Sequence, residues 1–364
     1  MGPFFNRQMK QLKRYPLRAN EQLQAWDAAD ELILQHMGTL DLTGKKILMI
    51  NDHFGAIGCG LQEFDLTLYT DSFISFKSTQ LNSGGKLNPI NELSLLNGVY
   101  DFVLIQLPKN MSYFEDVLCH LTLHLGSHSK VICTSMVKHL AAASFDLLNK
   151  YIGKTTTSLA QKKARLIFAD FEMEKAVSVY PLKVKFAQFE HDFINHSNLF
   201  SREKLDIGTR FFLEHLPKGE YGKILDLGCA NGILGIAFKK LNPKSQIMFC
   251  DESKMALLSA EVNYNNYFSD GAEYHWTNCF EDGTKNSLDL VLCNPPFHQG
   301  HTVGDFIAVQ MFKDAYEALR PGGTLRVVGN SNLAYQTKLK KIFGNSKIVA
   351  TNNKFMIINC VKTI

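Results

Sequence analysis

The sequence contains an internal duplication, and this duplication limits the possible fold more than any other feature. An apolar run at 46–50 and a second run at 223–227 each lead, with the same spacing, into a pair of glycines. These glycines are Gly55 and Gly58 in the first half, and Gly232 and Gly235 in the second. Further similar segments follow in the same order: 68–72 with 248–252, 101–104 with 289–292, and 165–168 with 355–358. Several matches in register indicate two copies of one domain.

Each half alternates short apolar runs with helical patterns, which predicts an α/β fold with a parallel, doubly wound sheet in each half. In the second half we expect strands at 223–227, 246–250, 273–276, 288–292 and 324–328, helices at 233–241, 253–265 and 305–319, and a pair of strands within 346–362. The length of 364 residues exceeds what one hydrophobic core usually supports. We expect a first domain at 1–177, a linker at 178–196 and a second domain at 197–364.

The composition argues against several classes of protein. The longest apolar stretches are of strand length, whereas a membrane helix needs about 20 apolar residues. The amino terminus lacks the apolar core of a signal peptide, so we expect a cytoplasmic protein without a membrane partner. The eight cysteines include no C-x-x-C pair, and the twelve histidines include no H-E-x-x-H spacing. We therefore expect reduced thiols and no metal site.

The charge distribution permits an acidic partner. The net charge is only +4, but the residues before Glu21 carry several basic side chains and no acid. The basic residues are Arg7, Lys10, Lys13, Arg14 and Arg18, interleaved with Phe4, Phe5 and Tyr15. Such an arm could bind a phosphate backbone and stack on bases, or it could be a solvated terminus. Both interpretations stay open.

The strand at 223–227 leads into a turn of the form D-x-G-x-x-x-G, at the end of the strand where open parallel sheets bind ligands. Gly228 and Gly232 allow a tight turn and a close approach of the backbone to a ligand. The spacing differs from that of a dinucleotide-binding turn, and there is no Gly-Lys-Ser/Thr run to hold phosphates. Asp226 adds a negative charge, so the turn favours a cationic ligand with an amino-acid group.

Two further polar residues follow strands of the same predicted sheet. Asp251 ends the second strand, where an ionised carboxylate can accept hydrogen bonds from both hydroxyls of a ribose. The alternative is a charge that stabilises the next helix. Asn278 follows the third strand and could read the edge of an adenine, or it could be only a turn residue.

The segment Asn294-Pro295-Pro296-Phe297 follows the fourth strand of this sheet. The exocyclic amine of a base is a weak nucleophile, because its lone pair is delocalised into the ring. The Asn294 oxygen and the Pro295 carbonyl could each accept one of its N–H groups and aim the lone pair at a methyl donor, while the prolines fix the backbone. Phe297 could stack on a base taken out of its helix. The segment therefore predicts methylation of an amine.

With these two segments, the second half resembles a class I S-adenosylmethionine-dependent methyltransferase, a Rossmann-like domain. The whole chain resembles the bacterial ribosomal RNA guanine-N2 methyltransferases, which pair a degenerate amino-terminal copy with an active carboxyl-terminal one. Within that group it is more similar to the enzymes of 23S ribosomal RNA than to those of 16S ribosomal RNA. The segments behind this choice are 24–31, 340–345 and 350–355, and the segments 200–201 and 205–209 also resemble the family.

The resemblance implies S-adenosylmethionine as the cofactor and a role for each matching residue. The residues expected to bind the cofactor are Asp226, Gly228, Asn231 and Gly232 at its methionine part, Asp251 at its ribose, Asn278 at its adenine, and Asn294. The residues expected to act on the guanine N2 amine are Asn294 and Pro295, with Phe297 stacking on the base. The residues expected to close the pocket or contact RNA are Phe200, Ser201, Asp206, Thr209 and Lys354. The segment from Asp206 to Thr209 could instead be a helix cap.

The first copy departs from this pattern where activity requires it. Asn51 stands in place of Gly228, and Gln106-Leu107-Pro108-Lys109 stands in place of the Asn-Pro-Pro-Phe segment. We therefore expect the first domain to be catalytically inactive. It could serve as an RNA platform or only as a structural partner of the second domain.

The sequence thus predicts a monomeric enzyme that methylates the N2 amine of a guanine in ribosomal RNA, with 23S as the preferred RNA. The alternatives are 16S ribosomal RNA, an adenine N6 amine or a protein glutamine amide, because the same amine clamp serves each of them. A protein that binds RNA and keeps only a relic of the cofactor site is a further alternative. The intact Asp226, Asp251 and Asn294 argue against that last interpretation.

Overall fold

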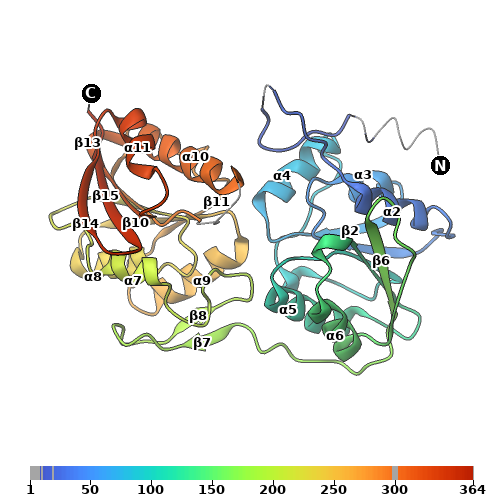
Figure 1. The fold of residues 1–364 in the computed structure, drawn as a ribbon. Helices are drawn as coiled ribbons and strands as arrows, with labels where there is room; N and C mark the ends of the chain where they lie inside the picture. The colour runs from blue at the N-terminus through green and yellow to red at the C-terminus, as the bar shows by residue number, and fades with distance from the viewer. Residues whose placement is uncertain (1–8, 10, 19, 297–301, 364) are drawn as a thin grey trace. The chain divides into compact units, whose positions relative to one another are not determined.

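The computed structural model describes residues 9–363 apart from 10, 19 and 297–301, so the predicted stacking residue Phe297 lies outside the described residues. The chain divides into two compact units between Tyr180 and Pro181. Each unit contains its own central sheet with helices packed against it (Figure 1).

In the second unit, seven strands form a sheet in the order β11-β10-β9-β12-β13-β15-β14. Neighbours from β11 to β13 are parallel, whereas β15 runs antiparallel to β13 and β14. The strands are β9 (Lys223–Leu227), β10 (Gln246–Asp251), β11 (Glu273–Trp276), β12 (Leu288–Cys293), β13 (Leu319–Asn330), β14 (Lys347–Thr351) and β15 (Phe355–Val361). The helices are α7 (Ile207–Leu213), α8 (Ile233–Leu241), α9 (Lys254–Asn265), α10 (Thr302–Ala318) and α11 (Tyr335–Phe343). The pair of strands expected within 346–362 forms the antiparallel edge.

One predicted boundary in this sheet is wrong. The sequence places a helix end at 319 and a turn at 320–323, but β13 already begins at Leu319, directly after α10. Leu319 pairs with Leu288 of β12, and the backbone of 322–323 exchanges hydrogen bonds of 2.8 and 2.9 Å with Lys362. These backbone partners, distant in sequence, extend the strand through a segment that reads locally as a turn.

In the first unit, six strands form a sheet in the order β2-β1-β3-β4-β6-β5. The strands are β1 (Lys46–Ile50), β2 (Asp65–Tyr69), β3 (Phe102–Gln106), β4 (Lys130–Met136), β5 (Thr155–Thr157) and β6 (Ala164–Asp170). The α-helices are α2 (Ala28–Met37), α3 (Ala56–Leu61), α4 (Phe73–Asn82), α5 (Met111–Leu121) and α6 (Ala142–Tyr151), and short 3-10 helices lie at Leu93–Leu95, Thr122–His124 and Val137–His139. This order repeats β10-β9-β12-β13-β15-β14, which confirms the predicted duplication. At the place of β11 the first unit has an isolated bridge between Tyr69 and Ile90.

The predicted linker at 178–196 needs correction, because most of it belongs to the second unit. It contains β7 (Leu182–Val184) and β8 (Phe193–Asn195), which pair as antiparallel strands. Phe186, Phe189 and Phe193 are buried in the core of the second unit. The second unit therefore begins at Pro181, and its first residues pack as a hairpin instead of crossing solvent.

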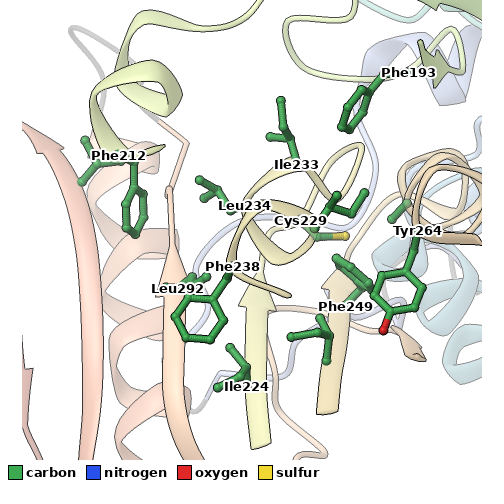
Figure 2. Packing of buried hydrophobic residues seen from close by; sticks show 14 of the residues in the cluster. Phe193, Phe212, Ile224, Cys229, Ile233, Leu234, Phe238, Phe249, Tyr264 and Leu292 are labelled. Atoms are coloured by element: carbon green, nitrogen blue, oxygen red, sulfur yellow. The ribbon is translucent and has the colours of Figure 1, made fainter. Parts of the chain in front are cut away.

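The core of the second unit explains why its strands are continuously apolar. Both faces of β12 are covered, and four successive residues from Leu290 to Cys293 have no exposed surface. On one face, Ile233, Leu234 and Phe238 of α8 pack in a cluster with Leu292 of β12 (Figure 2). No helix among the described residues is long and apolar enough to cross a membrane.

Candidate active site

Asp226 lies near the carboxyl end of β9 and is only 1% exposed. Its Oδ2 accepts a hydrogen bond of 2.8 Å from the backbone N–H of Gly235 in the first turn of α8. Burial is the main cause that raises the pKa of this carboxyl to about 8; the nearby charge of Asp251 also raises it, while the hydrogen bond from Gly235 lowers it. The second unit therefore holds a buried acid whose ionised form a cationic ligand would stabilise.

The turn after β9 depends on glycine at two positions. Gly228 and Gly232 have φ values of 73° and 79°, in the left-handed region that side chains disfavour. A Cβ on Gly232 would lie 3.1 Å from Ala260 and Phe249, and one on Gly228 would lie 3.1 Å from Met311. The predicted tight turn is therefore present, and it brings backbone close to the carboxyl edge of the sheet.

Asp251 is the last residue of β10, and its side chain stabilises this turn by a hydrogen bond. Its Oδ2 accepts from the N–H of Ala230 at 2.9 Å, and its Oδ1 accepts from the N–H of Ser253 at 3.0 Å. The structure thus brings together Asp226, the turn and Asp251 at the carboxyl ends of adjacent strands, as predicted from the parallel order. Asp251 also lies two residues before Ser253, the N-cap of α9, which is the position that the alternative interpretation gives it.

Asn278 lies at the same edge, just beyond β11. The N–H of the preceding Thr277 donates to the carbonyl of Asp251 at 3.2 Å, which connects the two strand ends. The Asn278 amide is 8% exposed and donates to Glu281 at 3.1 Å. Its position agrees with the predicted adenine site. Its hydrogen bond to Glu281, three residues later, is also one that a turn residue would make, so both interpretations of Asn278 stay open.

Asn231 stabilises the turn after β9 by hydrogen bonds that the sequence does not indicate. Its Nδ2 donates to Asn195 of β8 at 3.1 Å, and its Oδ1 accepts from the N–H of Ile233 at 3.3 Å. Asn263 of α9 donates to the Asn231 carbonyl at 3.1 Å and to the carbonyl of Ile194 at the same distance. Asn195 and Asn263 therefore hold the turn from the side of the hairpin. No sequence pattern marks them, since Asn195 lies in the segment read as a linker.

Asn294 follows β12 and faces α7. Its Nδ2 donates to Oγ1 of Thr209 at 2.9 Å, while its Oδ1 is buried and receives no hydrogen bond from any described residue. The next residue, Pro295, is buried. The structure thus joins two predicted residues that lie on different elements, and it leaves one amide acceptor open.

Asp206 and Thr209 form the predicted helix cap. Asp206 is the N-cap of α7, and its Oδ2 accepts from the N–H of Thr209 at 2.9 Å. The Thr209 hydroxyl also donates to that oxygen at 3.4 Å. The cap and the contact with Asn294 coexist, so the two interpretations of this segment do not exclude each other.

The other predicted substrate residues lie on exposed segments. Phe200 is 65% exposed, and Ser201 has a φ of 52° in the left-handed region. Lys354 is exposed on the turn between β14 and β15, next to Phe355, which packs against Gly208 of α7. The turn therefore lies close to the helix that carries Thr209. Within the described residues, no group of three or more His, Cys, Asp and Glu side chains is placed to hold a metal ion.

The first unit has different chemistry at the matching positions. Asn51 adopts a φ of 62° and its Oδ1 accepts from the Tyr113 hydroxyl at 2.7 Å. The Gln106 amide uses both ends: its oxygen accepts from the N–H of His53 at 2.9 Å, and its nitrogen donates to Asp30. Among the described residues, the amide that stands in place of Asn294 therefore has no open end.

Comparisons with known proteins place the chain in one family. The family described as Methyltransferase small domain matches residues 190–359, and the RLMG N-terminal domain matches residues 4–173. Proteins named ribosomal RNA large subunit methyltransferase G are 40% identical in Psychromonas ingrahamii and 41% identical in Stutzerimonas stutzeri, each over 96% of both chains.

A solved structure confirms the fold of the whole chain. It is that of a 16S rRNA N2 methyltransferase from T. thermophilus in complex with AdoMet and guanosine, at 21% identity and a TM-score of 0.79 over 92% of each chain. The tandem methyltransferase-like architecture predicted from the sequence is therefore correct. By its similarity to the curated relatives over nearly their full length, the chain belongs to the ribosomal RNA large subunit methyltransferase G family.

Proposed function

We propose that this protein transfers the methyl group of S-adenosylmethionine to the N2 amine of a guanine in 23S ribosomal RNA. The observation that carries the proposal is the open acceptor of Asn294, whose amide nitrogen is already bonded to Thr209. A buried acceptor without a donor is unfavourable by about 1–3 kcal/mol. An N–H of a substrate amine would supply the missing donor, and membership in the family supports an RNA of the large ribosomal subunit as the substrate.

The turn after β9 fits the methionine part of the cofactor in charge and in shape. Asp226 is a buried acid with a raised pKa, so an ammonium or sulfonium beside it would be stabilised when the carboxyl ionises. Gly228 and Gly232 let the backbone approach the ligand. We assign the ribose hydroxyls to Asp251 and the adenine edge to Asn278, which lie at the ends of the next two strands.

The bound cofactor supplies an electrophilic methyl group, and the protein positions the nucleophile. Asn294 Oδ1 and the Pro295 carbonyl accept the two N–H groups of the guanine amine, which localises the nitrogen lone pair and aims it at the methyl carbon. S-adenosylmethionine, held by Asp226, Gly228 and Gly232, would supply the methyl carbon to this nitrogen, and its sulfur would keep the electron pair of the carbon–sulfur bond. The nitrogen then loses one proton to solvent, so no strong general base is required.

We also propose that the first unit binds the RNA. Its substituted amide and turn positions support a role other than catalysis. Lys13 and Arg14 come from the basic arm, and the Arg14 guanidinium lies 4.7 Å from the centre of the Phe54 ring, in the segment that matches the cofactor turn. At Arg14 the basic arm therefore packs against the first unit.

The test is a transfer assay with tritiated S-adenosylmethionine and RNA from cells that lack the enzyme. We expect label in 23S ribosomal RNA and none in 16S ribosomal RNA, with N2-methylguanosine as the nucleoside found by mass spectrometry. Label in 16S RNA, at adenine N6 or in a glutamine-containing protein would overturn the substrate assignment and keep methyl transfer. Absence of label from every acceptor would favour a protein that only binds RNA.

A further inference from the structure

The Asn294 side chain can act as an amine clamp only in one of its two amide orientations. An asparagine amide has an acceptor end and a donor end of almost equal shape, and a rotation of half a turn exchanges them. If the nitrogen faced the substrate, two donors would oppose each other. A neighbouring side chain must therefore stabilise the orientation in which the Asn294 oxygen faces the substrate.

We propose that Thr209 and Asp206 are positioning residues that fix the orientation of the Asn294 amide, an inference that rests on the proposed function. Asp206 accepts from the N–H of Thr209 at 2.9 Å and from its hydroxyl at 3.4 Å. An ionised carboxylate can only accept hydrogen bonds, so it draws the single hydroxyl hydrogen of Thr209 toward itself. The lone pairs of Oγ1 are then left for Asn294, and they receive its Nδ2 at 2.9 Å.

This directional chain makes the reversed amide unfavourable. With Asn294 reversed, its oxygen would face the lone pairs of Oγ1, and the hydroxyl hydrogen would have to leave Asp206 to bridge them. The observed order runs from Asn294 Nδ2 to Thr209 and from Thr209 to Asp206, with each group in its preferred role. The carboxylate at the start of α7 thus determines which amide end faces the substrate.

The first unit shows that the same elements are joined differently where no clamp is needed. Asp27 is the N-cap of α2, and Asp30 lies three residues later, as Thr209 does after Asp206. Asp30 accepts from the amide nitrogen of Gln106, which ends β3 in the place of Asn294. The amide oxygen of Gln106 is used by His53, however. A contact that served only to join helix and strand would not require an open oxygen. Of these two amides, only that of Asn294 has an oxygen without a donor among the described residues.

The experiment compares Thr209→Val with Thr209→Ser in the full-length protein. Valine keeps the shape of the side chain and removes the hydroxyl, so we expect kcat to fall about tenfold, the scale of one neutral hydrogen bond. KM for S-adenosylmethionine should stay within about twofold, since Thr209 is not assigned to the cofactor. Serine keeps the hydroxyl and should restore most of kcat. Thr324→Val is the matched control, because Thr324 is equally buried on β13, and it should leave kcat unchanged.

A double variant separates positioning from general packing. In an Asn294→Ala background there is no amide to orient, so adding Thr209→Val should lower kcat by less than about twofold. A full tenfold loss in that background would overturn the inference, as would a normal kcat for Thr209→Val alone. If Thr209→Val did not fold, a kcat for Thr209→Ser as low as that of Asn294→Ala would contradict the proposal. If Asn294→Ala itself kept full turnover, the amine clamp of the proposed function would fail instead.

Discussion

The two units share the same backbone arrangement around the first strand and differ in the hydrogen bonds that their polar side chains make. In both, an aspartate at the beginning of a central strand accepts from the N–H that begins the neighbouring strand: Asp101, just before β3, from Lys46, and Asp289, the second residue of β12, from Lys223, each at 2.9 Å. In both, a left-handed glycine, Gly55 or Gly232, is the N-cap of the helix after the first strand. The shared features belong to the scaffold.

The differences lie in where the polar side chains point. In the second unit, Asp226 on the strand accepts from the helix N–H of Gly235; in the first, Asp52 in the turn itself accepts from the corresponding N–H of Gly58 at 2.7 Å. Burial raises the pKa of Asp52 to about 6. A carboxyl of the turn thus sits at the start of α3 in the first unit. The comparison shows that side chains of the first unit hydrogen-bond to one another at positions where the second unit leaves the Asn294 oxygen open.

The largest effect is expected from the two amides that follow β12 and β3. Asn294→Ala should lower kcat about 100-fold, the scale of removing one transition-state hydrogen bond, with cofactor affinity nearly unchanged. Gln106→Ala should leave kcat unchanged but lower the free energy of unfolding by about 1–3 kcal/mol, because Asp30 and the His53 N–H lose a buried partner. Methyl-transfer kinetics and chemical denaturation measure these outcomes. An equal loss of kcat in both variants would contradict the assignment of a catalytic role to Asn294 and a structural role to Gln106.

The acids at the carboxyl end of the second strand of each copy, Asp251 and Asp71, should also differ in their effect on cofactor affinity. Asp251→Asn should weaken the affinity for S-adenosylmethionine by about tenfold or more, the scale of a hydrogen bond to a charged group. Asp71→Asn in the first unit should leave that affinity unchanged, because Asp71 is buried among groups of its own unit. Calorimetric titration of both variants is the measurement. An unchanged affinity for Asp251→Asn would refute the ribose assignment.

The cofactor affinity should depend on pH through Asp226. The pKa of this acid is raised from 3.8 to about 8 in the folded protein, so the free energy of unfolding should fall as pH rises through this interval. A cationic cofactor favours the carboxylate, so its affinity should rise with pH, by at most about tenfold per unit, and level off near pH 8. Asp226→Asn should flatten this profile, whereas Asp52→Asn should not change it. The same slope in Asp226→Asn and in the unsubstituted protein would exclude Asp226 as the source.

The smallest effect is expected from the basic arm. Replacing Lys13, Arg14 and Arg18 with alanine should weaken RNA binding several-fold and reduce its salt dependence by about 0.7 for each lost phosphate contact, the value for single strands. Binding measured over a range of salt concentrations tests this expectation. An unchanged slope would indicate that these side chains serve only to pack the arm, as the contact of Arg14 with Phe54 does.

Much of the second sheet could be predicted because its signals are local. Helix α8 begins and ends at the predicted residues, since Gly232 starts it and Pro243 follows its end. Helix α11 was not predicted; it follows Ala334, which provides no side-chain cap. The strands of the β7–β8 hairpin are only three residues long, too short for a clear alternation.

The site could be predicted as a set of strand ends, but the directions of its side chains could not. The parallel order places Asp226, Asp251 and Asn294 at one edge, which follows from topology alone. That Asn231 turns toward Asn195, and that Asn294 keeps its oxygen open, depends on partners from other elements. Such contacts leave no pattern in the sequence around either residue.

The central claim is that Asn294 holds the reacting amine beside the cofactor turn. It is tested most directly by a crystal structure with S-adenosylhomocysteine and a guanine-containing RNA fragment. We expect the guanine N2 about 2.7–3.2 Å from Asn294 Oδ1, the Asn294 nitrogen still hydrogen-bonded to Thr209, and the cofactor sulfur facing N2 from the turn that follows Asp226. A guanine bound elsewhere, or an Asn294 oxygen turned toward Thr209, would contradict it.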